Sequence, residues 1–334
     1  MYEDFYRFSG KPFQLSPDHR FFFNSTGHNR AMAYLRYGLR QGEGFIVITG
    51  GIGTGKSMLV ANLFAEIADQ DLVAAQLVST QIGDDDVLRM VSAAFGLPHE
   101  QLSKATMLNN LEAYFRARRA EGKRVLLVVD EAQNLPRRSI EELRMLSNYQ
   151  QEGQALLQSF LIGQAELKRT LQGTGMEQVR QRIIAGYHLR PLARDEMQSY
   201  IEHRLALVGW SGNPSISDEA YDHLHNATQG IPRRVNTLVD RLLLFGALEE
   251  KAQITAADVD TVVAEVAQEV GHSVPASAKA EQAGVQQPEA LGGDMGSRLE
   301  ALEATVARLQ EQMKKDRALL KKAILLQMEV DSDE

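Results

Sequence analysis

Cysteine is absent from this chain of 334 residues. Its absence excludes disulfides, thiolate metal sites and cysteine nucleophiles, and it is typical of proteins from a reducing compartment. Long apolar runs are absent too, because stretches such as VLLVV and RLLLFGAL fall well short of the roughly 20 residues that cross a bilayer. The N-terminal MYEDFYRFSGKPF lacks the basic start and apolar run of a secretory signal. We therefore expect a cytoplasmic protein without a membrane span.

Positive charge is scarce. The formal net charge is −8 at pH 7, and the lysines and arginines are scattered instead of gathered in a stripe. A surface dominated by contacts with a phosphate backbone needs the opposite balance. Nucleic-acid binding is therefore not favoured, although a local basic groove on an acidic protein would permit it.

Short apolar runs alternate with helical patterns over the first part of the chain. This alternation predicts an α/β fold in residues 31–192, with a mostly parallel five-stranded sheet flanked by helices. The five runs are FIVIT, LVAAQLV, RVLLVVD, ALLQSFLIG and IAGYHLRPL.

Two segments flank this core and differ from it in composition. Residues 1–30 are rich in aromatic side chains and proline, and we expect them to pack on the core as an irregular segment. Residues 193–270 have helical spacing without apolar strand patterns, with Ser217 or Asp218 as one N-cap. They predict a small lid domain of about four helices.

The C-terminal part of the chain has a different character. Residues 271–296 are rich in Ala, Gln, Gly, Pro and Ser, which is the composition of a flexible linker. Residues 297–330 carry apolar side chains at spacings of three and four, which predicts a helix. That helix either forms a short coiled coil or docks singly on a partner.

The segment GGIGTGKS fits the pattern G-x-x-x-x-G-K-[ST] of a phosphate-binding loop, or P-loop. Its glycines let successive backbone N–H groups surround phosphates, and the following helix N-terminus adds partial positive charge. Lys56 is expected to reach the β and γ phosphates, and the Ser57 hydroxyl to bind Mg²⁺. The predicted nucleotide-binding residues of this segment are Gly50, Gly51, Ile52, Gly53, Thr54, Gly55, Lys56, Ser57 and Met58.

A pair of carboxylates follows the apolar run RVLLVVD. Asp130 is expected to orient Mg²⁺ and its water, and Glu131 to polarise the attacking water as general base. A small-molecule kinase does not need such a glutamate, because its acceptor is not water. A GTPase would need a base-reading element such as N-K-x-D, which the sequence lacks. The loop and the pair together predict Mg²⁺-dependent hydrolysis of ATP.

Three further positions are candidates for catalysis. Gln164 follows the strand expected between the strand before the P-loop and the strand that ends at Asp130, where it could touch the γ-phosphate or the water. Arg180 or Arg182, in VRQRI, could reach into a neighbouring subunit and stabilise the charge of phosphoryl transfer. Arg233 or Arg234, in GIPRRVN, could close the helical domain over the nucleotide.

As a set, these segments resemble the AAA+ ATPases of the ExeA/GspA type, which share a superfamily with transposition ATPases of the TniB kind. The resemblance covers about residues 1–270. It implies an AAA+ core with a helical lid and ATP hydrolysis at the subunit interfaces of a homo-oligomer. The motifs that carry it are FSGKPFQLSPD, GHNRAMAYLRYGL, the P-loop, VVDEAQNL, EELRMLSN, LIGQAEL, RQRI with YHLRPL, and GIPRRVN.

The resemblance also implies roles for single residues. Gln164 matches the sensor-1 position, and Arg233 matches the sensor-2 arginine. Arg180 and Arg182 both fall in the arginine-finger region. The segment from Phe13 to Pro17 resembles the part of these proteins that lies near the adenine.

This chain departs from ExeA after the ATPase region. ExeA continues into a membrane span and a periplasmic peptidoglycan-binding region, whereas this chain has the linker and the short helix. It looks closer to the ATPases associated with exosortase and exopolysaccharide systems, which lack that membrane half. This likeness implies an ATPase that assembles or remodels a partner in an envelope secretion or exopolysaccharide-export system, recruited to the inner membrane by that partner. Two alternatives are an ATP-dependent DNA-binding regulator of transposition and a nucleotide-switched coiled-coil scaffold.

Overall fold

The structure is a computed structural model, and it describes residues 1–14, 18–68, 70–78 and 87–271. These residues belong to the first of the two units into which the chain divides, Met1–Ser273. The predicted linker at 271–296, apart from its first residue, and the predicted helix at 297–330 lie outside the described residues. Within the described ranges, every helix is too short or too polar to span a bilayer.

The five apolar runs form one parallel sheet, as predicted. Its strands are β1 (Phe45–Gly50), β2 (Leu72–Val78), β3 (Arg124–Asp130), β6 (Gln158–Gly163) and β7 (Ile183–Leu189). Their order across the sheet is β2-β3-β6-β1-β7, and all neighbours pair in parallel. The strand before Gln164 therefore lies between β1 and β3, where the sequence predicts it.

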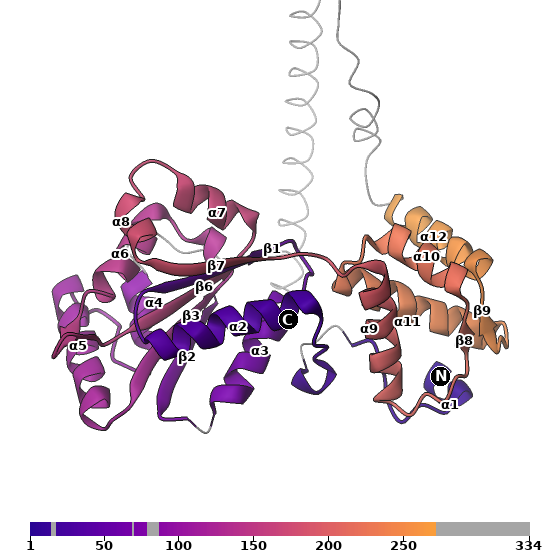
Figure 1. The fold of residues 1–334 in the computed structure, drawn as a ribbon, viewed down its shortest axis with the longest axis horizontal. Helices are drawn as coiled ribbons and strands as arrows, with labels where there is room; N and C mark the ends of the chain where they lie inside the picture. The colour runs from indigo at the N-terminus through magenta and orange to yellow at the C-terminus, as the bar shows by residue number, and fades with distance from the viewer. Residues whose placement is uncertain (15–17, 69, 79–86, 272–334) are drawn as a thin grey trace, which may run out of the picture. The chain divides into compact units, whose positions relative to one another are not determined.

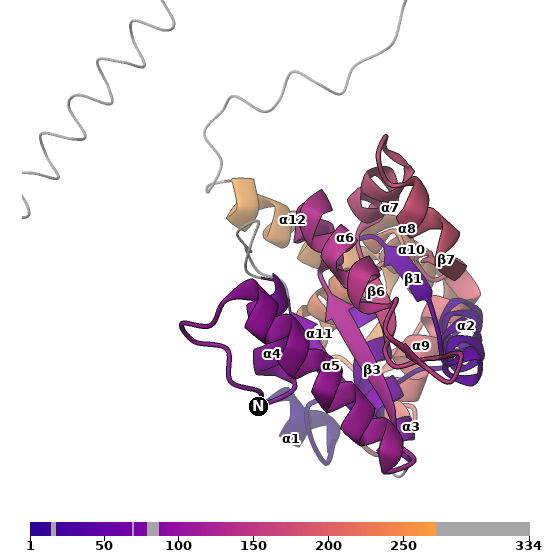
Figure 2. The same cartoon turned by 90° about the vertical axis from the view of Figure 1, so that its left-hand side faces the viewer.

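Helices cover both faces of the sheet (Figure 1, Figure 2). One face packs against α2 (Thr26–Gln41) and α3 (Lys56–Ile67). The other face packs against α4 (Val87–Ala94), α5 (Lys104–Ala120), α6 (Arg137–Leu146), α7 (Ala165–Gln172) and α8 (Glu177–Gln181). Shorter elements in this region are η2 (Ala132–Asn134), β4 (Gln150–Gln151) and β5 (Gln154–Ala155).

Alternating side chains of the central strands enter these two apolar layers. Ile46 and Ile48 of β1 lie in the layer with α2 and α3, whereas Phe45 and Val47 lie in the opposite layer. Successive strand residues point to opposite faces, and a parallel sheet is buried on both. This is why β1 and β3 appear in the sequence as continuous apolar runs. It also fixes the C-terminal ends of both strands at one edge of the sheet.

The second part of the described unit is helical. It contains α9 (Arg194–Ala206), α10 (Asp218–Thr228), α11 (Pro232–Leu248) and α12 (Ala256–Gly271), with two short paired strands, β8 (Ser215–Ile216) and β9 (Gln253–Ile254). Of the two proposed caps of α10, Ser217 occupies the N-cap position, where its side chain accepts a hydrogen bond from the backbone N–H of Ala220.

The N-terminal segment contacts both the lid helices and the core. It contains α1 (Tyr2–Tyr6) and η1 (His19–Phe21), and the rings of Tyr2, Tyr6, Phe8, Phe13 and Phe21 lie in the apolar cluster of the lid helices. Phe22 instead packs against the core cluster that contains α2 and α3. The hydroxyl of Tyr2 donates to Asp240 of α11 at 2.6 Å. These aromatic rings enlarge the apolar core of the lid helices by burying further apolar surface.

Candidate active site

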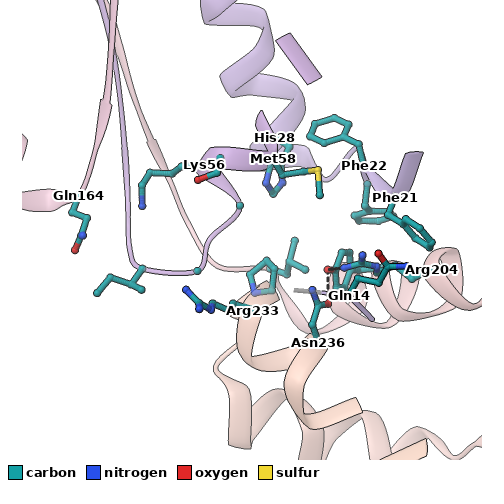
Figure 3. Close-up of a pocket in the computed structure, with 18 of the residues that line it drawn as sticks. Gln14, Phe21, Phe22, His28, Lys56, Met58, Gln164, Arg204, Arg233 and Asn236 are labelled. Carbon is teal, nitrogen blue, oxygen red and sulfur yellow. Dashed lines mark hydrogen bonds between the residues drawn. The ribbon is translucent and has the colours of Figure 1, made fainter. Parts of the chain in front are cut away.

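A cavity of about 300 Å³ lies where the P-loop, the N-terminal segment and the lid helices meet. Figure 3 shows two groups of side chains around it. The first, which we call the phosphate end, contains the labelled Lys56, Gln164 and Arg233, together with the lining residues Ser57 and Glu131. The second, which we call the ring end, contains the labelled Gln14, Phe21, Phe22, Arg204 and Asn236, together with the lining residue Tyr200.

The P-loop connects β1 to α3 and takes its shape from two glycines in the left-handed region. Gly53 has φ 78° and Gly55 has φ 98°, a conformation that side-chain-bearing residues rarely adopt. Space is short as well, because a Cβ on Gly55 would lie 2.6 Å from Nε2 of His28. The hydroxyl of Thr54 donates to Gly51 O at 2.9 Å and closes the turn.

Lys56 begins α3 and points back across the loop. Its Nζ donates to Gly50 O and Gly51 O, both at 2.9 Å, and only 6% of the residue is exposed. Burial lowers the pKa of this ammonium, while the carboxylates of Glu131 and Asp130 favour its charged form. The present hydrogen-bond acceptors of Lys56 are neutral carbonyls. A negatively charged phosphate would form a stronger hydrogen bond with this ammonium group.

Asp130 ends β3 opposite the start of α3. The hydroxyl of Ser57 donates to Oδ2 of Asp130 at 3.4 Å, and the carboxylate is 4% exposed. Burial raises the pKa of Asp130, whereas hydrogen bonds from the backbone N–H of Glu131 and from Ser57 oppose this effect. A hydroxyl and a carboxylate are oxygen ligands of the kind that Mg²⁺ prefers, so these two residues fit the metal.

Glu131 follows directly in a left-handed conformation, with φ 51°. Its Oε2 accepts hydrogen bonds from Nε2 of Gln133 at 2.5 Å and from Nε2 of Gln164 at 3.4 Å. Gln164 thus lies beside the carboxylate and lines the cavity, at the end of β6. The adjacency of β3 and β6 brings the two strand ends together.

Arg233 reaches the cavity from the lid. Its backbone N–H donates to Gly53 O at 3.1 Å, and its side chain lines the phosphate end. Its neighbour Arg234 is exposed and does not line this cavity. Pro232 at the start of α11 fixes the direction of the helix N-terminus.

Arg204 of α9 dominates the ring end. The residue is 2% exposed, and its guanidinium carbon lies 4.9 Å from the ring centroid of Phe21, 5.7 Å from that of Phe13 and 5.5 Å from that of Tyr200. Its Nη1 donates to the Tyr200 hydroxyl at 2.7 Å, which donates to Oδ1 of Asn236 at 2.6 Å. Aromatic faces stabilise a buried cation. Arg204, its rings and Asn236 thus form one connected set of contacts along this side of the cavity.

Comparisons with known proteins agree with this geometry. A family described as an AAA domain matches residues 39–171. General secretion pathway protein A of Aeromonas hydrophila is 34% identical over 267 residues, which are 80% of this chain and 48% of that protein. The part of this chain that these comparisons cover is therefore an AAA+ ATPase region of the ExeA/GspA type. The chain spans about half the length of this relative.

Solved structures share the AAA+ fold at low identity. Cdc6p from Pyrobaculum aerophilum has a TM-score of 0.58 at 18% identity and covers 79% of this chain and 74% of its own. The ORC2 protein of Aeropyrum pernix, in complexes with ADPNP and ADP, has a TM-score of 0.53 at 16% identity, with 73% and 70% covered. At such identities the likeness concerns the fold alone.

The AAA+ cavity contains some of the predicted site residues and not others. Gly50, Gly51, Thr54 and Asp130 lie behind its wall, where they shape the loop and the acidic strand end. The residues that do line it are Ile52, Gly53, Gly55, Lys56, Ser57, Met58, Glu131, Gln164 and Arg233.

The two arginines proposed to act on a neighbouring subunit do not line this cavity. Nη1 of Arg180 donates to Leu171 O at 2.9 Å and to Gly173 O at 3.0 Å. Nη2 of Arg182 donates to Oδ1 of Asn148 at 2.5 Å. Neither arginine thus belongs to the cavity of its own AAA+ domain.

Several residues of the AAA+ site escaped the sequence prediction. Gln133 stands inside the quoted motif VVDEAQNL, two positions after Glu131, so a signal for it existed. Arg204 and Asn236 carry no such signal, because an arginine or asparagine in a helical pattern reads as a surface residue. His28 is similar: it is buried beside the P-loop, and burial lowers its pKa to about 4.

Proposed function

We propose that this AAA+ ATPase couples Mg²⁺-dependent ATP hydrolysis to the assembly or remodelling of a partner in an envelope secretion or exopolysaccharide-export system. One observation carries the proposal: Lys56, Glu131 and the lid residue Arg233 line the same cavity. A nucleotide held there would contact both the core and the lid, so its hydrolysis would change how the lid is held.

The phosphate end divides the catalytic work among its residues. Lys56 would hold the β and γ phosphates, and Glu131 would accept the proton of the attacking water. Gln164 lies beside that carboxylate and could orient the water. Mg²⁺ held by Ser57 and Asp130 would neutralise charge on the phosphate oxygens.

The ring end would hold the nucleoside. Phe21 and Tyr200 offer apolar ring surface of the kind that a flat base contacts, and Arg204 holds both rings in place. The Oδ1 of Asn236 accepts the hydrogen bond of the Tyr200 hydroxyl. Because Asn236 lines the cavity, its Nδ2 would donate to an acceptor of the nucleoside.

We propose Arg182 instead of Arg180 as the arginine that acts on a neighbouring subunit. The Arg180 guanidinium is engaged by two backbone carbonyls and by the carboxylate of Glu177 at 3.0 Å. The Arg182 guanidinium contacts the neutral amide of Asn148. Because Arg180 has three acceptors, one of them a carboxylate, and Arg182 has one neutral acceptor, moving Arg182 would break fewer contacts.

The partner would be a protein of the envelope machinery, and it would bring this cytoplasmic ATPase to the inner membrane. The name and sequence identity of general secretion pathway protein A support this part. The DNA-binding and scaffold alternatives gain no support from a specific feature of the described residues, and we do not adopt them.

Mixing two inactive variants tests assembly with shared sites. Lys56→Ala disables the P-loop and keeps the arginine, whereas Arg182→Ala keeps the P-loop. Each alone should lose most ATP hydrolysis, and the mixture should recover part of it, because one subunit supplies Arg182 to the other's P-loop. Arg180→Ala, the matched control, should stay active by itself. Failure of the mixture to recover, or a fully active Arg182→Ala, would contradict the shared site.

A further inference from the structure

Gln133 bridges the two polar strand ends of the site. It is the middle residue of η2, the short helix that begins directly after Glu131. Its Oε1 accepts a hydrogen bond from the backbone N–H of Gln164 at 2.9 Å, and its Nε2 donates to Oε2 of Glu131 at 2.5 Å. The amide oxygen of Gln133 therefore binds the residue that follows β6, and its amide nitrogen binds the carboxylate that follows β3. Asn and Gln carry an acceptor oxygen and a donor nitrogen side by side in one neutral amide, and Gln has the longer reach.

The sheet leaves room for this bridge at Gly163. A Cβ on Gly163 would lie 2.7 Å from Oε1 and 3.1 Å from the backbone N of Gln133. The glycine is the last residue of β6, and its backbone is not in the left-handed region. A missing side chain on one strand therefore accommodates the amide that extends from the neighbouring strand end.

The backbone of Glu131 also requires support from its surroundings. A left-handed backbone costs a non-glycine residue about 1–2 kcal/mol, and it persists where neighbouring contacts hold it. Two contacts do so here: the Glu131 N–H donates to Oδ1 of Asp130 at 2.9 Å, and Gln133 binds the carboxylate. The side-chain amides of Gln133 and Gln164 both donate to Oε2 of Glu131. This leaves Oε1 of Glu131 as the oxygen that would accept a proton from water.

We propose that Gln133 is a positioning residue for ATP hydrolysis, which holds the Glu131 carboxylate in register with Gln164. The inference rests on the proposed role of Glu131 as general base. Gln133 does not line the cavity, so it acts through Glu131 and not on the nucleotide. Its loss should therefore affect the chemical step and leave ATP binding intact.

Two substitutions at Gln133 separate its donor from its acceptor. Gln133→Met removes both. Gln133→Glu keeps an acceptor for the Gln164 N–H but cannot donate to Glu131 and places a second negative charge beside it. Because a displacement of about 1 Å can cost about 100-fold in rate, we expect kcat to fall about 10- to 100-fold in both variants. KM and the Kd of the fluorescent analogue mant-ATP should stay within about twofold of the parent.

Gly163→Ala displaces the same amide from the opposite strand. It alters no residue that touches the cavity, and its methyl group would overlap Oε1 of Gln133. It should reproduce the fall in kcat with an unchanged Kd for mant-ATP. Thermal unfolding of each variant checks that the fold persists.

Glu131→Gln, measured in parallel, separates this inference from the proposed function. If Glu131→Gln hydrolyses ATP at the parent rate, the general base is misassigned and the role of Gln133 is wrong with it. If Glu131→Gln is inactive while folded Gln133→Met has the parent kcat, only the Gln133 inference is wrong. A raised kcat in Gln133→Met, or a Kd that weakens in step with kcat, would also overturn it.

Discussion

The phosphate end and the ring end of the cavity differ in how the chain builds them. Lys56 and Ser57 come from one loop, and Asp130 and Glu131 from one strand end, so two short stretches of sequence make most of the phosphate end. Phe21, Tyr200 and Asn236 of the ring end come from an N-terminal segment and two lid helices. The residues proposed to bind phosphate are therefore mostly neighbours in sequence, whereas the ring end depends on tertiary packing.

The proposed roles of the two ends would also use different forces to hold a nucleotide. Lys56 and Arg233 bring positively charged side chains to the phosphate end. At the ring end, Arg204 is covered by aromatic rings and engages Tyr200, so its charge organises the wall. Substitutions at the two ends should therefore separate into effects on phosphate and effects on nucleoside.

The largest effect is expected for Lys56→Ala. Loss of one preorganised cation at transferring phosphates should lower kcat/KM for ATP by at least about 100-fold. Inhibition by inorganic tripolyphosphate, which can occupy only the phosphate end, should disappear in a competition assay against mant-ATP. Lys168→Ala, a change at an exposed lysine on α7, is the control and should leave both unchanged. Retained tripolyphosphate binding in Lys56→Ala would show that phosphate lies elsewhere.

Arg233→Ala should have the next largest effect. The side chain lines the phosphate end, so its removal should lower kcat about 10- to 30-fold by loss of a charged contact from the lid. Arg234→Ala is the matched control, because that arginine is exposed on the same turn, and its kcat should stay within about twofold of the parent. Steady-state phosphate release measures both. The reverse ranking would assign the lid contact to Arg234.

Arg204→Met should act on the ring end alone. It replaces the cation with an apolar side chain of similar length, and we expect KM for ATP to rise about 5- to 10-fold as the rings lose a cation–π partner. The tripolyphosphate inhibition constant should not change. A parallel loss of tripolyphosphate affinity would mean that the two ends are not separable.

The smallest effect concerns stability and His28. Unfolded His28 binds a proton near pH 6.5, but the buried side chain stays neutral until about pH 4 because burial lowers its pKa. Protonation thus favours the unfolded state as pH falls through this window, and it should remove about 1 kcal/mol of stability by pH 5.5. Denaturant unfolding at pH 7 and 5.5 should show a smaller loss for His28→Gln than for the parent. Equal losses would contradict a buried neutral His28.

The sequence predicted the elements that depend on local pattern. The strands and the P-loop are continuous stretches of sequence, and their residue types are enough to predict their local structure. The parallel order that brings Gln164 beside Glu131 also followed from the alternation of runs and helices. Because β1 and β3 are buried on both faces, they appear in the sequence as continuous apolar runs that differ from the helical patterns around them.

The remainder depended on contacts between distant segments. The rings of residues 1–30 were expected on the core, and Phe22 packs there while Tyr2, Tyr6, Phe8, Phe13 and Phe21 pack with the lid helices. Apolar side chains do not by themselves specify which surface they cover. Arg204 could not be recognised as buried until the N-terminal rings were placed over it. Gln133 was visible beside Glu131, but its direction depends on the left-handed turn at Glu131 and on the space at Gly163.

The central claim is that water attacks ATP at the phosphate end with Glu131 as its base. Glu131→Gln, incubated with radiolabelled ATP and Mg²⁺ and separated from free nucleotide, tests it most directly. The account predicts that the variant retains bound ATP and releases phosphate at least about 100-fold more slowly than the parent. Recovery of bound ADP at the parent rate would contradict it.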